Sequence, residues 1–441
     1  MTITHGGRVS ELLADVPIPR MFRARQSFPR PRIAAAEIAS TVASRLSDEA
    51  IAERIAPGMK IAITAGSRGI ANIDSITKAI ADFVKSRGGL PFIVPSMGSH
   101  GGATAEGQRA ILAGYGISEE TMGCPIRSSM ETVSLGHSWL GKPVYIDRNA
   151  YESDGIIVSC RIKPHNAFRG PYESGICKMM VVGLGKREGA ESVHADGMGK
   201  MAENLVANAA VVLQKTPILF ALASIENAYD ETCILEAVAK EHILEREPTL
   251  LRKAFAHMPR IIVGKADVLV VDEIGKKYSG TGVDPNITGT FSTEFASGGL
   301  EVQRSCMLDL AESSGGNGLG VGLASAITRR LYDKLDSETM YPNCLTSTII
   351  TSAMIPLVLA NDKEAIQACL RTLNGVDPDK PRVVRIANSL HIEFIMLSEA
   401  YYAEVLRGYF PGLEACGEPE EPTFDTEGNL ADRTIPLGEG R

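Results

Sequence analysis

One stretch decides the fold: residues 60–102 read KIAITAGSRGIANIDSITKAIADFVKSRGGLPFIVPSMGSHGG. A short apolar run at 60–64 ends in a glycine-rich loop, and apolar residues then recur at helical spacing over 72–87. A second apolar run at 90–94 opens into another glycine-rich loop, which carries His100. Strand, glycine-rich loop and helix in repeated order are typical of an α/β sheet with parallel strands. Ligands bind to such sheets where strands end and loops begin, so we expect a site at these loops.

The same alternation continues along the chain. We predict a helix over 104–114, a strand over 155–159, a long glycine-rich loop over 161–200, a helix over 201–215 and a strand over 218–223.

A second set of elements follows a boundary near residue 260, with strands predicted at 266–271 and 383–387. We therefore expect an α/β protein of two domains with parallel or mixed sheets flanked by helices. The N-terminal domain, 1–260, carries the loops with the candidate residues. The C-terminal domain, 261–441, closes an interdomain cleft that holds the active site. Residues 1–32 are predicted to form an irregular arm.

The composition excludes several classes of protein. The chain has 441 residues, 44% of them hydrophobic, so it is long enough for two domains with buried cores. Its 45 basic and 53 acidic residues give a formal charge of -8, which argues against a nucleic-acid groove. No apolar run reaches the roughly 20 residues of a membrane helix, and we expect a cytoplasmic protein. The eight cysteines stand singly, which argues against a disulfide scaffold and a zinc or iron–sulfur cluster.

Three of the eight histidines lie in glycine-rich loops that follow strands: His100, His165 and His194. The other five lie near the terminus or in helical or amphipathic contexts, where a packing or surface role is usual. Imidazole titrates near neutral pH and also binds metals. These three histidines are therefore candidates for acid–base or metal chemistry.

Lys178 lies in apolar company, directly before Met-Met-Val-Val-Gly. Burial lowers the pKa of a lysine and frees its amine for covalent chemistry. The alternative is a lysine at the edge of a core whose amine reaches water. One continuous helix would hold Lys178 and His194 about 24 Å apart, but three intervening glycines disfavour such a helix. The chain can therefore double back and place both side chains in one pocket with His165.

Arg68 lies in a strand-end loop flanked by glycines, which suits a bidentate clamp for a carboxylate or phosphate. The alternative is a solvated surface arginine. The phosphate-binding P-loop, the dinucleotide fingerprint with its expected context and the nucleophile elbow of hydrolases are all missing from the sequence.

The order and spacing of these loops resemble the lactate racemase family over roughly residues 20–400. The resemblance implies a nickel-pincer nucleotide, a pyridinium mononucleotide that carries nickel, attached covalently to Lys178, with His194 as the nickel ligand. It also implies that His100 and His165 are the catalytic bases and that Arg68 binds the substrate carboxylate.

The activity implied is that of a racemase or epimerase, which inverts C2 of a 2-hydroxy acid by reversible hydride transfer to the cofactor. One histidine takes the hydroxyl proton and the other reprotonates the oxygen, and a pKa near neutrality suits both directions. The implied partners are the small-molecule substrate and the enzymes that make the cofactor.

The sequence departs from the lactate-specific pattern. Ala65 stands where the family often has an acidic residue, and the expected Gln-x-x-Lys pair of the second domain is not evident. The polar loop 276–288 makes a longer hydroxylated acid, such as a sugar acid, a candidate substrate. Two alternatives stay open: a zinc or iron hydrolase that uses the loop histidines, and a non-catalytic protein that binds small anions.

Overall fold

The computed structural model describes residues 6–67, 69–432 and 435. The chain divides into two compact units, and the central unit is Pro29–Met258. The terminal unit consists of the described residues of Met1–Phe28 and Pro259–Arg441. The expected domain 1–260 therefore differs from the central unit at its start, because the residues before Pro29 pack with the C-terminal part of the chain.

The central unit is an α/β domain. Its helices and strands, in chain order, are η1 (Ala35–Glu37), α2 (Ile38–Leu46), α3 (Glu49–Ala52), β2 (Lys60–Ala65), α4 (Ile73–Ser86), β3 (Leu90–Pro95), η2 (Gly101–Ala103), α5 (Ala105–Gly114), α6 (Glu119–Met122), β4 (Thr132–His137), β5 (Pro143–Asp147), α7 (Arg148–Tyr151), β6 (Gly155–Arg161), α8 (Ile176–Lys178), η3 (Met179–Gly183), α9 (Lys186–His194), η4 (Met198–Lys200), α10 (Met201–Lys215), β7 (Ile218–Glu226), β8 (Thr232–Ala239), η5 (Lys240–His242) and α11 (Ile243–His257).

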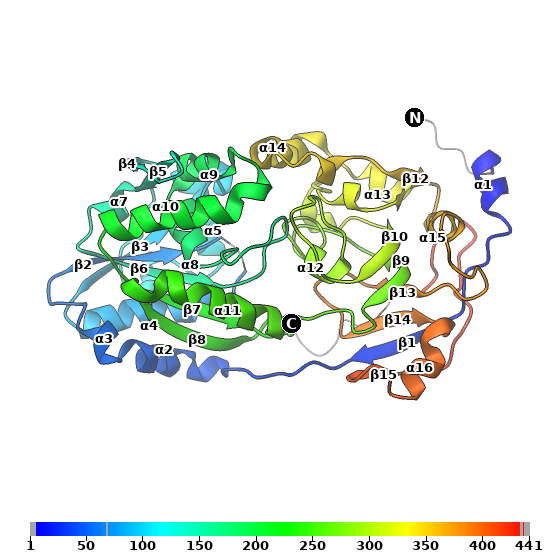
Figure 1. Cartoon of the computed structure of the whole chain (residues 1–441), viewed down its shortest axis with the longest axis horizontal. Helices are drawn as coiled ribbons and strands as arrows, with labels where there is room; N and C mark the ends of the chain where they lie inside the picture. The colour runs from blue at the N-terminus through cyan, green and yellow to red at the C-terminus, as the bar shows by residue number, and fades with distance from the viewer. Residues whose placement is uncertain (1–5, 68, 433–434, 436–441) are drawn as a thin grey trace. The chain divides into compact units, whose positions relative to one another are not determined.

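The central sheet has the strand order β3-β2-β6-β7-β8. The first four strands are parallel, and β8 pairs antiparallel with β7. Strand β2 is buried at all but its first residue, as expected of a parallel strand covered on both faces. Helix α4 buries Ile76, Ile80 and Val84, which recur every four residues and so share one face. Figure 1 shows α10 on one side of this sheet and α2 and α4 on the other.

The segment 161–200, expected as one long loop, contains α8, η3, α9 and η4. That expectation is right for 162–175 and wrong for most of 176–200, because Gly185 and Gly189 serve close packing and do not break the helices. A Cβ on Gly185 would lie 2.0 Å from the Val181 carbonyl oxygen, and one on Gly189 would lie 2.5 Å from the same atom. Glycine therefore lets the start of α9 approach the backbone of η3 closely.

The terminal unit is also built on one sheet. Its elements are α1 (Arg8–Leu13), β1 (Met21–Gln26), β9 (Lys265–Val271), α12 (Pro285–Thr288), β10 (Glu301–Met307), η6 (Glu312–Ser314), η7 (Val321–Leu323), β11 (Ala326–Thr328), α13 (Arg329–Asp333), α14 (Ser337–Ser347), η8 (Thr351–Ala353), β12 (Leu357–Leu359), α15 (Asp362–Arg371), β13 (Val383–Ile386), β14 (Phe394–Ser398), η9 (Glu399–Tyr401), α16 (Tyr402–Leu406) and β15 (Leu413–Ala415).

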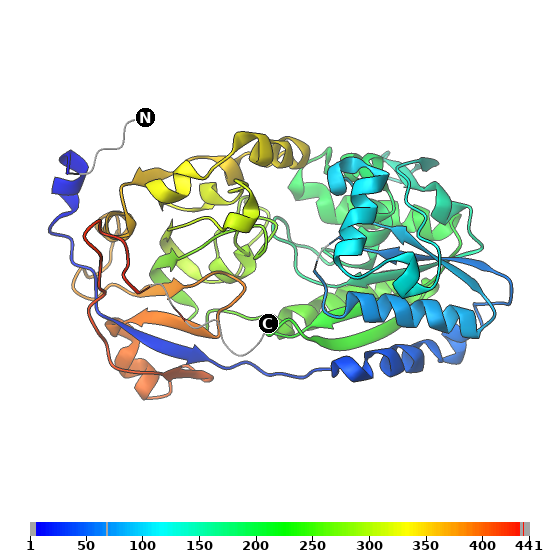
Figure 2. The same ribbon diagram turned by 180° about the vertical axis from the view of Figure 1, so that it is seen from behind.

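The terminal sheet has the order β12-β11-β10-β9-β13-β14-β1-β15. The five strands from β12 to β13 are parallel, and the pairs that join β13, β14, β1 and β15 are antiparallel. Its core contains Val268, Val270, Cys306 and Ile366. Figure 2 shows β1, in blue, beside the orange strands from the other end of the sequence. The irregular arm expected at 1–32 is therefore wrong for the residues of α1 and β1.

Among the described residues, none of the helices combines the length and apolarity that crossing a bilayer requires.

Candidate functional site

The carboxyl ends of β2, β3 and β6 lie together at one edge of the central sheet, because all three strands are parallel and adjacent. The chain goes from β2 to β3 on one side, and later strands are added on the other side of β2. This makes the gap between β2 and β6 a topological switch point, where ligands of open α/β sheets bind. The loops that carry His100 and His165 start from this edge.

His100 lies in the turn after β3 and is exposed. Its Nδ1 forms a short hydrogen bond with the Ser67 hydroxyl, which comes from the loop after β2. Because a hydroxyl can both donate and accept, Ser67 is compatible with either tautomer of the His100 ring. The backbone carbonyl of His100 also accepts a hydrogen bond of 3.3 Å from the Gln108 side chain. The ring thus contacts a neighbouring loop, and the backbone of His100 contacts α5.

His165 is held by a buried carboxylate. Glu173 Oε2 accepts a 2.7 Å hydrogen bond from the His165 backbone N–H, and Oε1 accepts one of 3.2 Å from Gly170. Burial raises the pKa of Glu173, while these N–H donors and the positive charges of Arg169 and Lys178 act in the opposite direction. The loop between β6 and α8 is therefore folded around one carboxylate that is 2% exposed.

The His165 ring has a defined tautomer. Its Nδ1 accepts a 3.1 Å hydrogen bond from the Ala167 backbone N–H. Since a backbone N–H can only donate, the neutral ring carries its proton on Nε2. The Phe168 ring packs on the imidazole with centroids 4.3 Å apart, which further restricts its rotation.

Lys178 ends the short helix α8 and is half-buried. The start of this helix is anchored by Glu247 of α11, whose Oε2 accepts a 2.8 Å hydrogen bond from the Cys177 backbone N–H. The carboxylate approaches so closely that a Cβ on Gly175 would lie 2.3 Å from Oε1. Burial raises the pKa of Glu247 to about 7. A carboxyl group that is 1% exposed thus supports the backbone directly before the lysine.

Helix α11 is supported in turn at Pro248, which lies inside it. Proline has no N–H, so the Leu244 carbonyl four residues earlier loses its helical donor. The Tyr172 hydroxyl donates a 2.7 Å hydrogen bond to this carbonyl. The loop before α8 and the helix behind it are therefore joined at two points, through Tyr172 and through Glu247.

His194 ends α9, and its Nδ1 lies 2.6 Å from the carbonyl oxygen of Ala190 one turn earlier. A carbonyl accepts only, so Nδ1 carries the proton and Nε2 keeps its lone pair. This is the arrangement in which a histidine binds a metal through Nε2. Burial lowers the pKa of His194, the positive charge of Lys178 lowers it further, and the bond to Ala190 opposes both effects. The ring is thus a neutral donor near pH 7.

The positive charge of Lys178 thus acts on the pKa of His194. The helical path between them is interrupted, as the sequence predicts, but the interrupting residue is Lys186, at φ +54°, and not one of the three glycines. The His100 loop contacts the same segment, since the Gly98 N–H donates to the Gly183 carbonyl at 3.3 Å. All four described candidates, His100, His165, Lys178 and His194, are on elements of the central unit. Arg68 lies outside the described residues.

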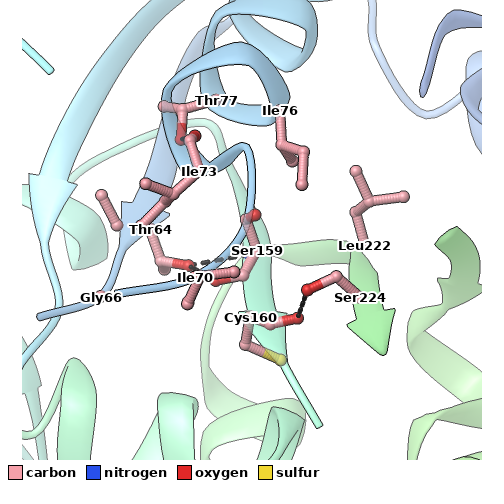
Figure 3. Close-up of a pocket in the computed structure, with 11 residues that line it drawn as sticks. Thr64, Gly66, Ile70, Ile73, Ile76, Thr77, Ser159, Cys160, Leu222 and Ser224 are labelled. Carbon is pink, nitrogen blue, oxygen red and sulfur yellow. Dashed lines mark hydrogen bonds between the residues drawn. The ribbon is translucent and has the colours of Figure 1, made fainter. Parts of the chain in front are cut away.

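A small pocket lies at the switch point, between the ends of β2, β6 and β7 and the start of α4 (Figure 3). Its wall includes Ile70, Ile73 and Leu222. Thr64 Oγ1 donates to the Ser159 carbonyl at 3.0 Å and accepts from the Ser159 N–H at 2.8 Å. The pocket is thus mainly apolar, with its threonine hydroxyl engaged in the wall. None of the candidate histidines lines it.

The donors present fit a cofactor that supplies its own metal ligands. In the described part of the chain, His, Cys, Asp and Glu side chains form no group of three or more that could hold a metal ion. The Nε2 lone pair of His194 can bind a metal that an organic group already holds. The expected interdomain cleft stays a prediction.

Sequence reasoning missed Ser67, Glu173, Glu247 and Lys186. Ser67 stands beside Arg68 in a loop already singled out, so its position was a usable signal. The sequence contains no such signal for Glu173 and Glu247, because the role of each depends on burial against segments that are distant in sequence. Lys186 follows Gly-Leu-Gly, a pattern considered only as a nucleotide motif.

Comparisons with known proteins found a family model that matches part of the chain. Residues 13–205 match the family model described as the lactate racemase N-terminal domain. No curated protein matches the sequence. Eight chains of solved structures match it. One, the crystal structure of a protein from Thermotoga maritima, is 14% identical with a TM-score of 0.48, over 64% of this chain and 72% of that chain. Another, the lactate racemase apoprotein from Thermoanaerobacterium thermosaccharolyticum, is 12% identical with a TM-score of 0.46, over 85% and 90%.

Proposed function

Because residues 13–205 match the model of the lactate racemase N-terminal domain, we propose that the protein is a racemase or epimerase of 2-hydroxy acids. We further propose that it uses a nickel-pincer nucleotide attached to Lys178, with His194 as the protein ligand of nickel. A small-molecule 2-hydroxy acid would be its substrate, and the enzymes that make the cofactor would be its partners.

One observation carries the proposal. The His194 ring keeps its Nε2 lone pair because Nδ1 faces the Ala190 carbonyl, and the same ring lies within the electrostatic reach of the Lys178 amine. A tether and a metal ligand must lie together in this way if one organic group is to occupy both. Nickel also accepts imidazole nitrogen readily.

When bound, the cofactor supplies a hydride acceptor for the hydrogen on C2. The residues of this chain would handle the proton on the substrate oxygen. His100 is suited to accept it, since the Ser67 hydroxyl can support the tautomer with a free Nε2. His165 would donate one in its imidazolium form, because the neutral ring, whose single proton is on Nε2, cannot release that proton near neutral pH. Reaction in the opposite direction reverses these roles.

Arg68 is proposed as the clamp for the substrate carboxylate, and the residues near 276–288 as contacts to a longer substrate such as a sugar acid. A planar guanidinium binds a carboxylate through two parallel hydrogen bonds, which fixes the orientation of C2. Orientation matters because the hydride and the proton must leave in defined directions.

The test combines intact mass with nickel quantification on the chain produced beside the cofactor-making enzymes. We expect a mass adduct, nickel bound to the chain, and interconversion of the two C2 stereoisomers of at least one acid in a panel from lactate to sugar acids. Lys178→Ala should lose the adduct. Lys200→Ala, which changes an exposed lysine paired with Glu203, should keep it.

Two outcomes would overturn the proposal. A wild-type chain that gains no adduct and no nickel beside those enzymes would be a binding protein and not this racemase. Zinc bound without an adduct would favour the hydrolase. Turnover of lactate with no turnover of any polyhydroxy acid would reject the sugar-acid substrate alone.

A further inference from the structure

Lys186 is a lysine in an unusual place. Its side chain is 0% exposed, and its backbone has φ +54°, a conformation that residues with a Cβ rarely adopt. It is the first residue of α9, the helix that ends at His194. A fully buried lysine in a left-handed conformation persists only where the surroundings hold it firmly.

Three acceptors surround its amine. Nζ donates to the Pro95 carbonyl at the end of β3 at 2.5 Å and to Gln108 Oε1 of α5 at 3.1 Å. It also lies 3.2 Å from Oδ2 of Asp147, which ends β5 and is itself 0% exposed. The amine therefore makes two hydrogen bonds and one ion pair. Lys186 thus ties together β3, α5, β5 and α9.

Gln108 extends this contact to the His100 loop. While its Oε1 accepts from Lys186, its Nε2 donates to the Gly98 carbonyl at 2.8 Å and to the His100 carbonyl at 3.3 Å. The backbone on both sides of Ser99 is therefore held by one amide group. That amide is in turn oriented by the lysine.

Burial opposes both charges of the ion pair, since it raises the pKa of Asp147 and lowers the pKa of Lys186. An apolar pair of similar volume often stabilises a core as well as a buried ion pair does. Stability therefore gives no special reason for a lysine here. Two hydrogen bonds and an ion pair to three separate elements do require it, because an apolar side chain makes neither.

We propose that Lys186 is a positioning residue, which holds the His100 loop, through Gln108, and the start of the helix of His194 in one fixed arrangement. This inference rests on the proposed function for the roles of the two histidines. Its structural content, that one buried amine sets the positions of both imidazoles, can be tested separately.

The experiment uses the full chain without cofactor, with ¹⁵N-labelled histidine, and follows the NMR signals of His100 and His194. The main variant is Lys186→Met/Asp147→Asn, which removes both buried charges together and keeps the Asp147 Oδ1 bond to the Ala150 N–H available through the asparagine oxygen. The second is Gln108→Met, which cuts only the link to the His100 loop. The control is Arg187→Met, the next residue of α9, whose side chain is exposed.

We expect the double variant to change the NMR signals of both histidines, and Gln108→Met to change those of His100 alone. The control should change neither. In the loaded enzyme, kcat of both test variants should fall by about 100-fold with little change in KM, as expected when reacting groups are misplaced by about 1 Å.

The inference is overturned if Gln108→Met leaves His100 unchanged, or if a folded double variant leaves both rings as in the wild type. If the double variant does not fold, Gln108→Met decides. Should the wild type turn over no acid while the histidine signals respond as expected, the proposed function fails and the positioning role stands.

Discussion

The buried carboxyl group behind Lys178 makes a pH-dependent stability prediction. Glu247 is 1% exposed, and its Oε1 has no hydrogen-bond partner among the described residues. Burial raises its pKa from 4.5 to about 7. Glu247→Gln keeps the shape and the acceptor for the Cys177 N–H but cannot ionise.

The sign follows from proton binding. Between pH 4.5 and 7 the folded chain holds a proton on Glu247 that the unfolded chain releases, so this group stabilises the fold at low pH and loses that contribution as pH rises through 7. With these two pKa values the loss between pH 5 and pH 8 is roughly 2.5 kcal/mol. Glu247→Gln cannot ionise and so does not show this loss. The free energy of unfolding of the variant minus that of the wild type should therefore increase by about that amount from pH 5 to pH 8.

The assay is urea unfolding of the full chain at pH 5 and pH 8, followed by circular dichroism and by hydrogen exchange of α8 and α11. The matched control is Glu245→Gln on the same helix, where the glutamate is 85% exposed. It should show no such change with pH. Equal differences between Glu247→Gln and the wild type at both pH values would refute the reasoning.

Three further predictions concern the same region. Lys178→Ala should raise the pKa of His194, measured by NMR titration of the chain without cofactor, because the lysine charge lowers that pKa; an unchanged titration would place the amine elsewhere. Gly175→Ala should cost about 1–3 kcal/mol in urea unfolding, because its Cβ would meet a carboxylate oxygen at 2.3 Å. Gly114→Ala, which meets nothing within 4 Å, should change stability by less than about 1 kcal/mol. Glu173→Ala should cost about 1–3 kcal/mol for each backbone N–H it orphans and speed hydrogen exchange in the loop after β6; unchanged exchange would contradict its role.

The sequence predicts well those elements whose pattern is local. The strands β2, β3, β6 and β9 follow from short apolar runs, and α4, α5 and α10 from helical spacing, with ends within a few residues. Strand β1 could not be predicted in the same way. Its residues alternate, but the partners that bury them, β14 and β15, come from the far end of the chain.

The candidate site shows the same division. His100 and His165 could be found because glycine-rich loops after parallel strands meet at one edge of a sheet. The tautomer of His165 could not, since it depends on the Ala167 N–H, and neither could the contact of the His100 ring with Ser67. The importance of Lys186 was also hidden, because its three acceptors lie on elements that only folding brings together.

The place of β1 in the terminal sheet has a consequence for synthesis. On the ribosome this strand is made first, but its two neighbours, β14 and β15, are made last. Until these neighbours are made, the backbone N–H and C=O groups of β1 have no partner strand. The unit Pro29–Met258 contains all the strands of its own sheet, so it can fold during that interval. In the cell, the central unit should therefore fold before the terminal unit. The terminal sheet can then take up β1 only after β14 and β15 have been made.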